Sequence, residues 1–222
     1  MVNIKICGLR TMEDVQAVNE ARPDYIGFVF APGRRQVTAS QAAAMREQLA
    51  PGIQAVGVFV NESVDRILSL VEAGIIDVIQ LHGDETEQMI LELKAKTKAP
   101  VIRAVRVRTT DDIHRAFSVP SDYLLFDTYT KDAYGGSGRT FDWSCIPPME
   151  RPYFLAGGLT PNNIIQAART PAFCLDISSG VETDGRKDPD KIRRVVETIR
   201  AYNRNTTQTL FKNPSLQTIS NQ

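Results

Sequence analysis

The sequence has 222 residues, and its 26 basic and 26 acidic side chains give a formal net charge of zero at pH 7. This balance excludes a strong overall attraction to nucleic acid or to an acidic membrane surface. Apolar residues make up 42% of the chain, enough for a sizeable core, and no apolar run approaches the roughly 18–20 residues that span a bilayer. Because the amino terminus also shows no secretory signal pattern, the disordered, secreted and membrane classes are excluded.

The cysteine and histidine content bears on the cellular compartment and on metal binding. Cys7, Cys145 and Cys174 are odd in number and far apart, which argues against a disulfide framework and favours a reducing cytoplasm. There is no Cys-x-x-Cys pair, and the histidines are His82 and His114 alone. A structural zinc site is therefore not expected.

Short runs rich in β-branched residues alternate along the chain with longer helical patterns. The runs are almost continuously apolar, which is typical of parallel strands covered by helices. They begin at the spacing of a βα unit, in which a crossover helix returns the chain to a parallel strand. The predicted strands are Asn3–Cys7, Tyr25–Phe30, Gln54–Val60, Asp77–Leu81, Val101–Val105, Tyr123–Asp127, Tyr153–Ala156 and Phe173–Ile177.

Capping patterns mark the predicted helix starts. A capping side chain is followed three residues later by a reciprocal partner in four places, and a capping residue precedes a proline in two others. The four pairs are Thr11 with Asp14, Thr38 with Gln41, Asp84 with Glu87 and Thr109 with Asp112, and the two proline starts are Thr160-Pro161 and Asp188-Pro189.

The interval between the sixth and seventh strands is irregular. It contains the glycine-rich run 134–138 and has room for only a short helix near Phe141–Cys145. The glycines precede no clear helix, so we interpret Gly135–Gly138 as a flexible lid rather than as a phosphate cradle. The sixth helix is therefore expected to be irregular.

Eight βα units without a break in composition predict a single, compact (β/α)8 TIM barrel over residues 1–203. An open doubly wound sheet is the alternative. Such a sheet normally carries a nucleotide-binding loop after its first strand, and Cys7-Gly8-Leu9-Arg10 is not such a loop. Residues 204–222 are rich in Asn, Gln, Thr and Ser, and we expect them to form a mostly disordered polar tail.

Functional residues in such a barrel collect at the carboxyl ends of the strands. Alternate residues of a strand share a face, so Lys5 lies on the face of Cys7. A buried lysine is costly unless it is paired, and because the eighth strand neighbours the first, Asp176 is the expected partner of Lys5. The candidates for catalysis or substrate binding are Cys7, Gln80, His82, Asp127, Gly157, Gly158, Asp176, Ser178, Ser179 and Gly180, with Arg34 and Arg35 in the loop after the second strand.

Several of these candidates could instead have structural roles. A lone cysteine at a strand end is most often a small buried hydrophobe, and His82 could simply bond a backbone carbonyl. Arg34 and Arg35 could form a solvated pair in their loop. Asp127 could bind a loop amide, but a carboxylate that follows three apolar residues at the rim of a barrel favours function.

The loops after the seventh and eighth strands favour an anionic ligand. Gly157-Gly158 lets backbone amides approach a ligand closely, and Ser178-Ser179-Gly180 adds further amides and two hydroxyls. Barrels frequently bind phosphate between these two loops, where free N–H groups and a helix dipole favour negative charge. The architecture therefore predicts a phosphorylated small molecule as the ligand.

Eight sequence motifs occur in order along residues 2–200. They are Lys5-Ile6-Cys7-Gly8, Gly27-Phe28-Val29-Phe30, Val58-Phe59-Val60-Asn61, Gln80-Leu81-His82-Gly83, Asp127-Thr128, the run Tyr134–Trp143, Ala156-Gly157-Gly158-Leu159 and the run Asp176–Glu182. Together they resemble the phosphoribosylanthranilate isomerase family of tryptophan biosynthesis, whose fold is a TIM barrel of the ribulose-phosphate-binding type.

The resemblance implies an aldose–ketose isomerase, an intramolecular oxidoreductase that needs no cofactor. The implied reaction is the Amadori rearrangement of N-(5-phospho-β-D-ribosyl)anthranilate to 1-(2-carboxyphenylamino)-1-deoxy-D-ribulose 5-phosphate. The resemblance assigns the general base to Cys7, the general acid to Asp127 and the active-site arginine to Arg35. The loop Pro32–Gln36 is one residue shorter than the family pattern, so Arg34 stays an alternative. We expect a cytoplasmic monomer or homodimer that binds this substrate and neither nucleic acid nor membrane.

The implied chemistry suits these residue types. A carboxylic acid can protonate the ribose ring oxygen as the C1′–O bond breaks to give a Schiff base. A thiolate can then remove the C2′ proton, provided that a cation or a helix terminus lowers the pKa of the thiol. An arginine can hold the anthranilate carboxylate through two parallel hydrogen bonds.

Two other functions remain open at the level of sequence. A barrel of the indole-glycerol-phosphate synthase type would favour lysine and glutamate inside its early strands, and Tyr25–Phe30 and Gln54–Val60 contain neither. A barrel that binds a phosphometabolite without turnover, as a sensor or scaffold, would not need both Cys7 and Asp127. A substrate-dependent loss of anthranilate-type fluorescence would separate the three.

Overall fold

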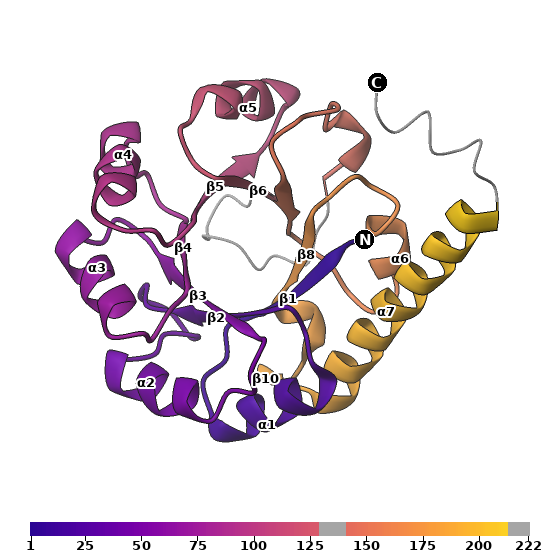
Figure 1. Cartoon of the computed structure of the whole chain (residues 1–222), viewed down its shortest axis with the longest axis horizontal. Helices are drawn as coiled ribbons and strands as arrows, with labels where there is room; N and C mark the ends of the chain where they lie inside the picture. Colours follow the sequence, from indigo (N-terminus) through magenta and orange to yellow (C-terminus); the bar gives the residue numbers. More distant parts are fainter. Residues whose placement is uncertain (129–140, 213–222) are drawn as a thin grey trace.

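The computed structural model describes residues 1–128 and 141–212. Eight parallel strands pair in sequence order and close into a barrel, with helices packed around the outside (Figure 1). The predicted TIM barrel is therefore confirmed, and the open doubly wound sheet is wrong. The strands are β1 Asn3–Cys7, β2 Tyr25–Val29, β3 Gln54–Phe59, β4 Val78–Leu81, β5 Val101–Val107, β6 Tyr123–Thr128, β7 Tyr153–Leu155 and β8 Cys174–Ile177.

The helices cover the outer face of the barrel, and a small hairpin, β9 Glu182–Thr183 with β10 Arg186–Lys187, follows β8. Between β6 and β7 the described residues hold only the 3-10 helix η2, so the irregular sixth helix is confirmed; the predicted lid at 135–138 lies outside the described residues. No helix within the described ranges is long and apolar enough to cross a membrane. The helices are α1 Met12–Ala21, α2 Ala39–Glu47, α3 Val64–Glu72, α4 Glu87–Lys96, α5 Thr110–Arg115, α6 Ile164–Ala167 and α7 Pro189–Lys212, with the 3-10 helices η1 Ala116–Ser118, η2 Trp143–Cys145 and η3 Ser179–Val181.

Most predicted helix starts are confirmed. Reciprocal capping bonds open α1 at Thr11, α2 at Thr38 and α5 at Thr109, and α7 begins at Pro189 after Asp188.

Two starts are wrong. Helix α4 is capped by Thr86 instead of Asp84, because the Asp84 carboxylate pairs with Arg106. Helix α6 begins at Ile164 instead of Pro161, because the Asn163 side chain bonds the loop backbone at Gly158 and Thr160 and holds this stretch as a turn.

Two apolar layers stabilise the barrel. The larger layer lies between the sheet and the helices, and it includes Ile4, Ile26 and Leu124. The second fills the barrel interior, where alternate strand residues such as Val56, Leu125 and Phe154 meet. Because side chains alternate along each strand, the interior rows continue toward the carboxyl ends, where they include the polar residues Gln80, Asp127 and Asp176, which line the cavity described below.

The carboxyl-terminal segment departs from the expected tail. Helix α7 runs from Pro189 to Lys212, so the predicted boundary at residue 204 falls inside a helix, and residues 213–222 lie outside the described residues. The helix packs beside α1 and is anchored at Asn203, whose amide donates to the Val2 carbonyl at 2.9 Å and accepts from the Val2 N–H at 3.0 Å. This buried clamp ties α7 to the amino terminus one turn after the buried Ile199.

Replacing Asn203 with alanine is expected to destabilise the fold. The change leaves a buried N–H and a buried carbonyl of Val2 without partners, at a cost of about 1–3 kcal/mol for each group. The exposed neighbour Arg204 is the matched control, and its replacement with alanine should change the free energy of unfolding by less than about 0.5 kcal/mol. A chain that ends after Asn203 should keep its melting temperature, because residues 204–206 are exposed. Urea unfolding measures the two substitutions and a thermal melt measures the truncation, and equal effects of the two substitutions would contradict the clamp.

Candidate active site

A cavity of about 450 Å³ lies at the carboxyl-terminal mouth of the barrel. This volume is typical of small-molecule sites. The strands run parallel, so all eight end at this mouth, and the side chains at their ends converge. The predicted site residues that line the cavity are Cys7, Arg35, Gln80, His82, Asp127, Gly157, Gly158, Asp176, Ser178 and Ser179, together with Arg34.

Lys5 does not line the cavity itself; it is fully buried and binds two residues that do. Its ammonium group donates to Asp176 Oδ2 at 2.9 Å, which confirms the predicted pair, and to Gln80 Oε1 at 2.8 Å. Burial alone would lower the pKa of Lys5, but the Asp176 carboxylate and the Cys7 thiol beside it outweigh burial and raise the pKa. Asp176 Oδ1 has no hydrogen-bond partner among the described residues, so one carboxylate oxygen at the cavity wall is free for a ligand.

Gln80, His82 and Asp127 form a second polar row that starts from Lys5. Gln80 Nε2 lies 2.9 Å from His82 Nδ1. His82 Nε2 lies 3.3 Å from Asp127 Oδ2, at an angle outside hydrogen-bond geometry. The two ends of this row are buried, with Gln80 1% and Asp127 4% exposed. The His82 ring therefore lies between two side chains, Gln80 and Asp127. The alternative prediction, that the ring bonds a backbone carbonyl, is wrong.

Cys7 is the last residue of β1, and its thiol is buried while it lines the cavity. Burial raises the pKa of this thiol, and Asp176 raises it further, whereas the Lys5 and Lys187 ammonium groups act to lower it. The Ser178 hydroxyl donates to the Cys7 carbonyl at 3.0 Å and so ties the end of β1 to the loop after β8. The site thus holds a buried thiol with two cations close enough to stabilise a thiolate.

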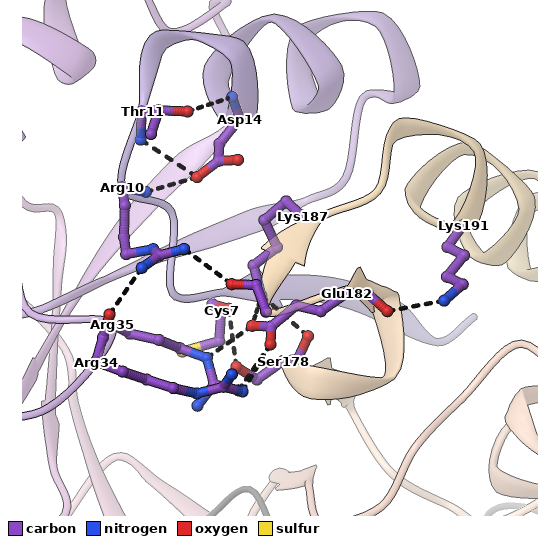
Figure 2. A network of polar contacts seen from close by, with 11 residues as sticks. Cys7, Arg10, Thr11, Asp14, Arg34, Arg35, Ser178, Glu182, Lys187 and Lys191 are labelled. Atoms are coloured by element: carbon purple, nitrogen blue, oxygen red, sulfur yellow. Dashed lines mark hydrogen bonds and ion pairs between the residues drawn. The ribbon is translucent and has the colours of Figure 1, made fainter.

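Glu182 gathers three cations beside Cys7, as Figure 2 shows. Its carboxylate accepts from Arg35 Nε at 2.7 Å and Arg35 Nη2 at 3.2 Å, from Arg34 Nη2 at 2.7 Å and from Lys187 Nζ at 3.1 Å. Burial would raise the pKa of Glu182, but the bonds from Arg35 and Lys187 lower it to about 2. The Arg35 side chain is 17% exposed and that of Arg34 is 55% exposed, so Arg35 is the more enclosed of the two arginines at the cavity.

Lys187 is the functional candidate that the sequence did not reveal. Its side chain is 2% exposed, and its ammonium group donates to the Ser178 carbonyl at 2.9 Å as well as to Glu182. Burial lowers the pKa of Lys187, and the charges of Glu182 and Cys7 act against that shift. Glu182 is the last residue of the motif Asp176–Glu182, but the sequence predicts no role for it. A two-residue strand such as β10 gives no periodicity from which Lys187 could have been found.

The two predicted phosphate loops meet at Gly180. A Cβ atom on Gly180 would lie 1.8 Å from the Leu159 carbonyl oxygen, so only glycine allows the loop after β8 to pack against the loop after β7. Among the predicted site residues, all of which lie in described segments, Gly180 is the one that does not line the cavity. The Ser178 hydroxyl already donates to the Cys7 carbonyl. The Ser179 hydroxyl and the backbone amides of the two loops are the groups that stay available to a ligand in the cavity.

The described residues contain no cluster of histidine, cysteine and carboxylate side chains that could hold a metal ion. All three cysteines lie in described segments and are unpaired.

Comparisons with known proteins agree on one family. Residues 4–198 match the family described as N-(5'-phosphoribosyl)anthranilate (PRA) isomerase. The chain is 48% identical to the N-(5'-phosphoribosyl)anthranilate isomerase of Endomicrobium trichonymphae over 202 residues, which cover 90% of this chain and all of that protein. A similar protein of Lachnoclostridium phytofermentans, with the same name, is 40% identical over 90% of this chain and 99% of its own length.

Solved structures agree with the sequence relatives. The crystal structure of phosphoribosyl anthranilate isomerase from Thermotoga maritima superposes with a TM-score of 0.82 at 35% identity, over 90% of this chain and all of that one. A second phosphoribosyl anthranilate isomerase structure, in complex with reduced 1-(o-carboxyphenylamino)-1-deoxyribulose 5-phosphate, superposes with a TM-score of 0.79 at 34% identity over the same shares of the two chains. The match over almost the whole barrel shows that this chain belongs to the N-(5'-phosphoribosyl)anthranilate isomerase family.

Proposed function

We propose that the barrel catalyses the Amadori rearrangement of N-(5'-phosphoribosyl)anthranilate to 1-(2-carboxyphenylamino)-1-deoxyribulose 5-phosphate, with Cys7 as general base and Asp127 as general acid. The observation that carries this proposal is that the two groups line one cavity from strands that are not neighbours. Cys7 ends β1 and Asp127 lies near the end of β6, with β7 and β8 between them. A sugar bound between them would receive a proton from one side and lose a proton to the other.

The order of proton transfers follows from the substrate. Asp127 protonates the ribose ring oxygen while the C1′–O bond breaks, which leaves a Schiff base between C1′ and the anthranilate nitrogen. The iminium acidifies the C2′ proton, and the Cys7 thiolate removes it to give an enolamine, which tautomerises to the ketone. Lys5 and Lys187 support this step because both cations favour the thiolate.

The remaining polar groups suit the two anionic ends of the substrate. The Arg35 guanidinium, held by Glu182, is proposed to bind the anthranilate carboxylate. The amides after β7 and β8, with the Ser179 hydroxyl, are proposed to bind the phosphate; α6 has only four residues, so its dipole adds little. One related structure is described as generated monomers of a dimeric isomerase from Thermotoga maritima, and for this chain we propose a cytoplasmic monomer or homodimer that requires neither cofactor nor metal.

The test is turnover by the purified protein. Adding the enzyme to freshly prepared N-(5'-phosphoribosyl)anthranilate should cause a loss of anthranilate-type fluorescence whose rate is proportional to enzyme concentration. The product should match 1-(2-carboxyphenylamino)-1-deoxyribulose 5-phosphate by mass and chromatography. Release of carbon dioxide and formation of an indole would instead indicate a synthase, and saturable binding of the substrate without turnover would indicate a sensor.

The phosphate site can be tested at Gly158. This residue has a φ of 67°, and aspartate is among the residues that tolerate this left-handed conformation, so Gly158→Asp should fold. The new carboxylate would repel the substrate phosphate, and KM should rise at least about tenfold, the equivalent of about 1.4 kcal/mol. Gly158→Asn, which has the same shape without the charge, is the matched control and should raise KM much less. A KM that stays unchanged in the aspartate variant would place the phosphate elsewhere.

The active-site arginine can be tested by comparing two alanine substitutions. Removing Arg35 should cost the charged bonds to the anthranilate carboxylate, about 1.5–3 kcal/mol, and so raise KM by about 10- to 150-fold. Removing Arg34 should have a mild effect, because its side chain is 55% exposed. Steady-state kinetics of both variants decide the assignment. The reverse ranking would assign the carboxylate to Arg34.

A further inference from the structure

A continuous row of buried polar side chains crosses the floor of the barrel mouth. It starts at β8, passes through β1, reaches β4 and ends at β6, with successive separations of 2.9, 2.8, 2.9 and 3.3 Å. Each member is at most 9% exposed. Strands β1 and β4 are not neighbours, so the Lys5 side chain spans the barrel interior to reach its partner. In order, the row consists of Asp176, Lys5, Gln80, His82 and Asp127.

Lys5 determines which way the Gln80 amide points. An ammonium group can only donate hydrogen bonds, so the amide atom 2.8 Å from Lys5 Nζ is the oxygen. Turning the amide over would set an NH2 group against a buried cation. Asp176 Oδ2 accepts from the same ammonium group and holds it in place. The Gln80 NH2 group therefore points toward His82.

The Gln80 amide in turn decides where His82 carries its proton. The NH2 group lies 2.9 Å from Nδ1 and can only donate, so Nδ1 accepts and the neutral ring carries its proton on Nε2. A proton on Nδ1 would place two donors against each other in a buried site. We propose that Lys5 and Gln80 are positioning residues which fix His82 as the Nε2–H tautomer and so present an N–H group to the Asp127 carboxyl.

This tautomer distinguishes the two oxygens of Asp127. Nε2 lies 3.3 Å from Oδ2, outside hydrogen-bond geometry in the free protein, and catalytic contacts of this kind often tighten only when substrate is bound. Because Oδ2 is the oxygen beside this N–H group and would accept from it once the contact tightens, the carboxylic acid carries its proton on Oδ1, and Oδ1 is the atom that hands the proton to the ring oxygen. The step from tautomer to proton transfer rests on the proposed function, whereas the tautomer itself rests only on the contacts.

The tautomer can be read directly by NMR. The protein contains two histidines, and the second, His114, is exposed and serves as an internal reference. In 15N-labelled protein, couplings between the ring protons and the ring nitrogens should show His82 with Nε2 protonated and Nδ1 unprotonated, under conditions in which the ring is neutral. In Gln80→Glu the carboxylate can accept from both Lys5 and His82, so the proton should move to Nδ1. A wild-type Nδ1–H ring, or an unchanged ring in this variant, would overturn the proposal.

Two further variants test the role of each positioning residue. Lys5→Met frees the Gln80 amide to rotate, so both tautomers of His82 should appear; retention of the pure Nε2–H form in a folded variant would remove Lys5 from the proposal. The loss of this cation leaves Asp176 buried and unpaired, and Lys5→Met could unfold for that reason. Gln80→Met then decides, because it keeps Lys5 paired and removes only the donor to His82, and it too should show both tautomers.

Kinetics test the link to Asp127 separately. Gln80→Glu should lower kcat by roughly 10²–10⁴-fold, the range for a general acid–base group, with a smaller change in KM. A moved proton with an unchanged kcat would overturn the role assigned to the tautomer in proton transfer. Because the NMR measurement needs no turnover, failure of the proposed reaction would leave the tautomer result intact, and the two outcomes are distinguishable.

Discussion

Cys7→Ser is expected to lower kcat by roughly 10²–10⁴-fold or more while the barrel stays folded. Serine has nearly the shape of cysteine, so the packing at the end of β1 and the bond from Ser178 to the Cys7 carbonyl should persist. Its hydroxyl is a far weaker acid than a thiol, and even two nearby cations do not make it a base near neutrality. Steady-state assays measure the loss of kcat, and a melting curve for each protein shows whether the barrel stays folded.

Asp127→Asn should lower kcat over the same range, because an amide keeps the shape of the carboxyl group and cannot donate a carboxylic proton. Both variants should still bind the product, since neither change touches Arg35 or the phosphate loops. If Cys7→Ser keeps near-normal turnover, residue 7 only packs, and His82 becomes the first candidate for removing the C2′ proton. A comparable loss in both variants with unchanged binding would support the assigned pair.

The pH dependence gives a second readout of Cys7. Cys7 must be a thiolate to act as a base, so kcat/KM should fall as the pH is lowered and the thiol is protonated. Because burial raises the pKa of this thiol, the fall should begin at a higher pH than it would for an exposed cysteine. Lys187 lowers this pKa, so Lys187→Met should move the acidic limb to higher pH. Lys96→Met removes an exposed lysine at the surface and should leave the limb where it is. An acidic limb that does not move would mean that Cys7 does not report on it.

The strand positions could be predicted because buried parallel strands are nearly continuous apolar runs. The same parity argument placed Lys5 opposite Asp176, and the structure confirms the pair. The strand ends converge at one mouth of the barrel. Residues predicted from their positions at strand ends, such as Cys7, Gln80 and Asp127, therefore line a single cavity.

The features that escaped prediction depend on distant partners. Asp84 has the sequence pattern of a cap, but Arg106 binds its carboxylate, so Thr86 caps the helix instead. Residues 204–212 are polar enough to suggest a tail, yet they continue the helix that starts at Pro189, directly after Asn203, which ties that helix to the amino terminus. Neither partner lies within the local window from which secondary structure is predicted.

Glu182 is the clearest case, because its importance comes from cations that lie far from it in sequence or on a hairpin too short to predict. Glu182→Gln is expected to weaken substrate binding and stability together. Glutamine has a single neutral acceptor oxygen, so Arg35 loses the charged two-bond contact that holds its guanidinium, and KM should rise. Lys187, which is 2% exposed, would be left buried without its counterion, and removing one partner of such a pair costs about 3–5 kcal/mol.

The pH dependence of stability separates this loss from a general packing defect. The pKa of Glu182 is lowered to about 2 in the folded protein, below the ordinary value of about 4.3 for an unfolded chain. Its stabilising contribution is therefore fully present above about pH 4.3 and is lost as the pH falls toward about 2. The difference in free energy of unfolding between wild type and Glu182→Gln should shrink over this interval. Glu92→Gln, which breaks an exposed pair with Lys96, should change the stability very little, because solvent screens that pair. A gap between wild type and Glu182→Gln that stays constant down to pH 2 would show that the carboxylate is not the source of the stability.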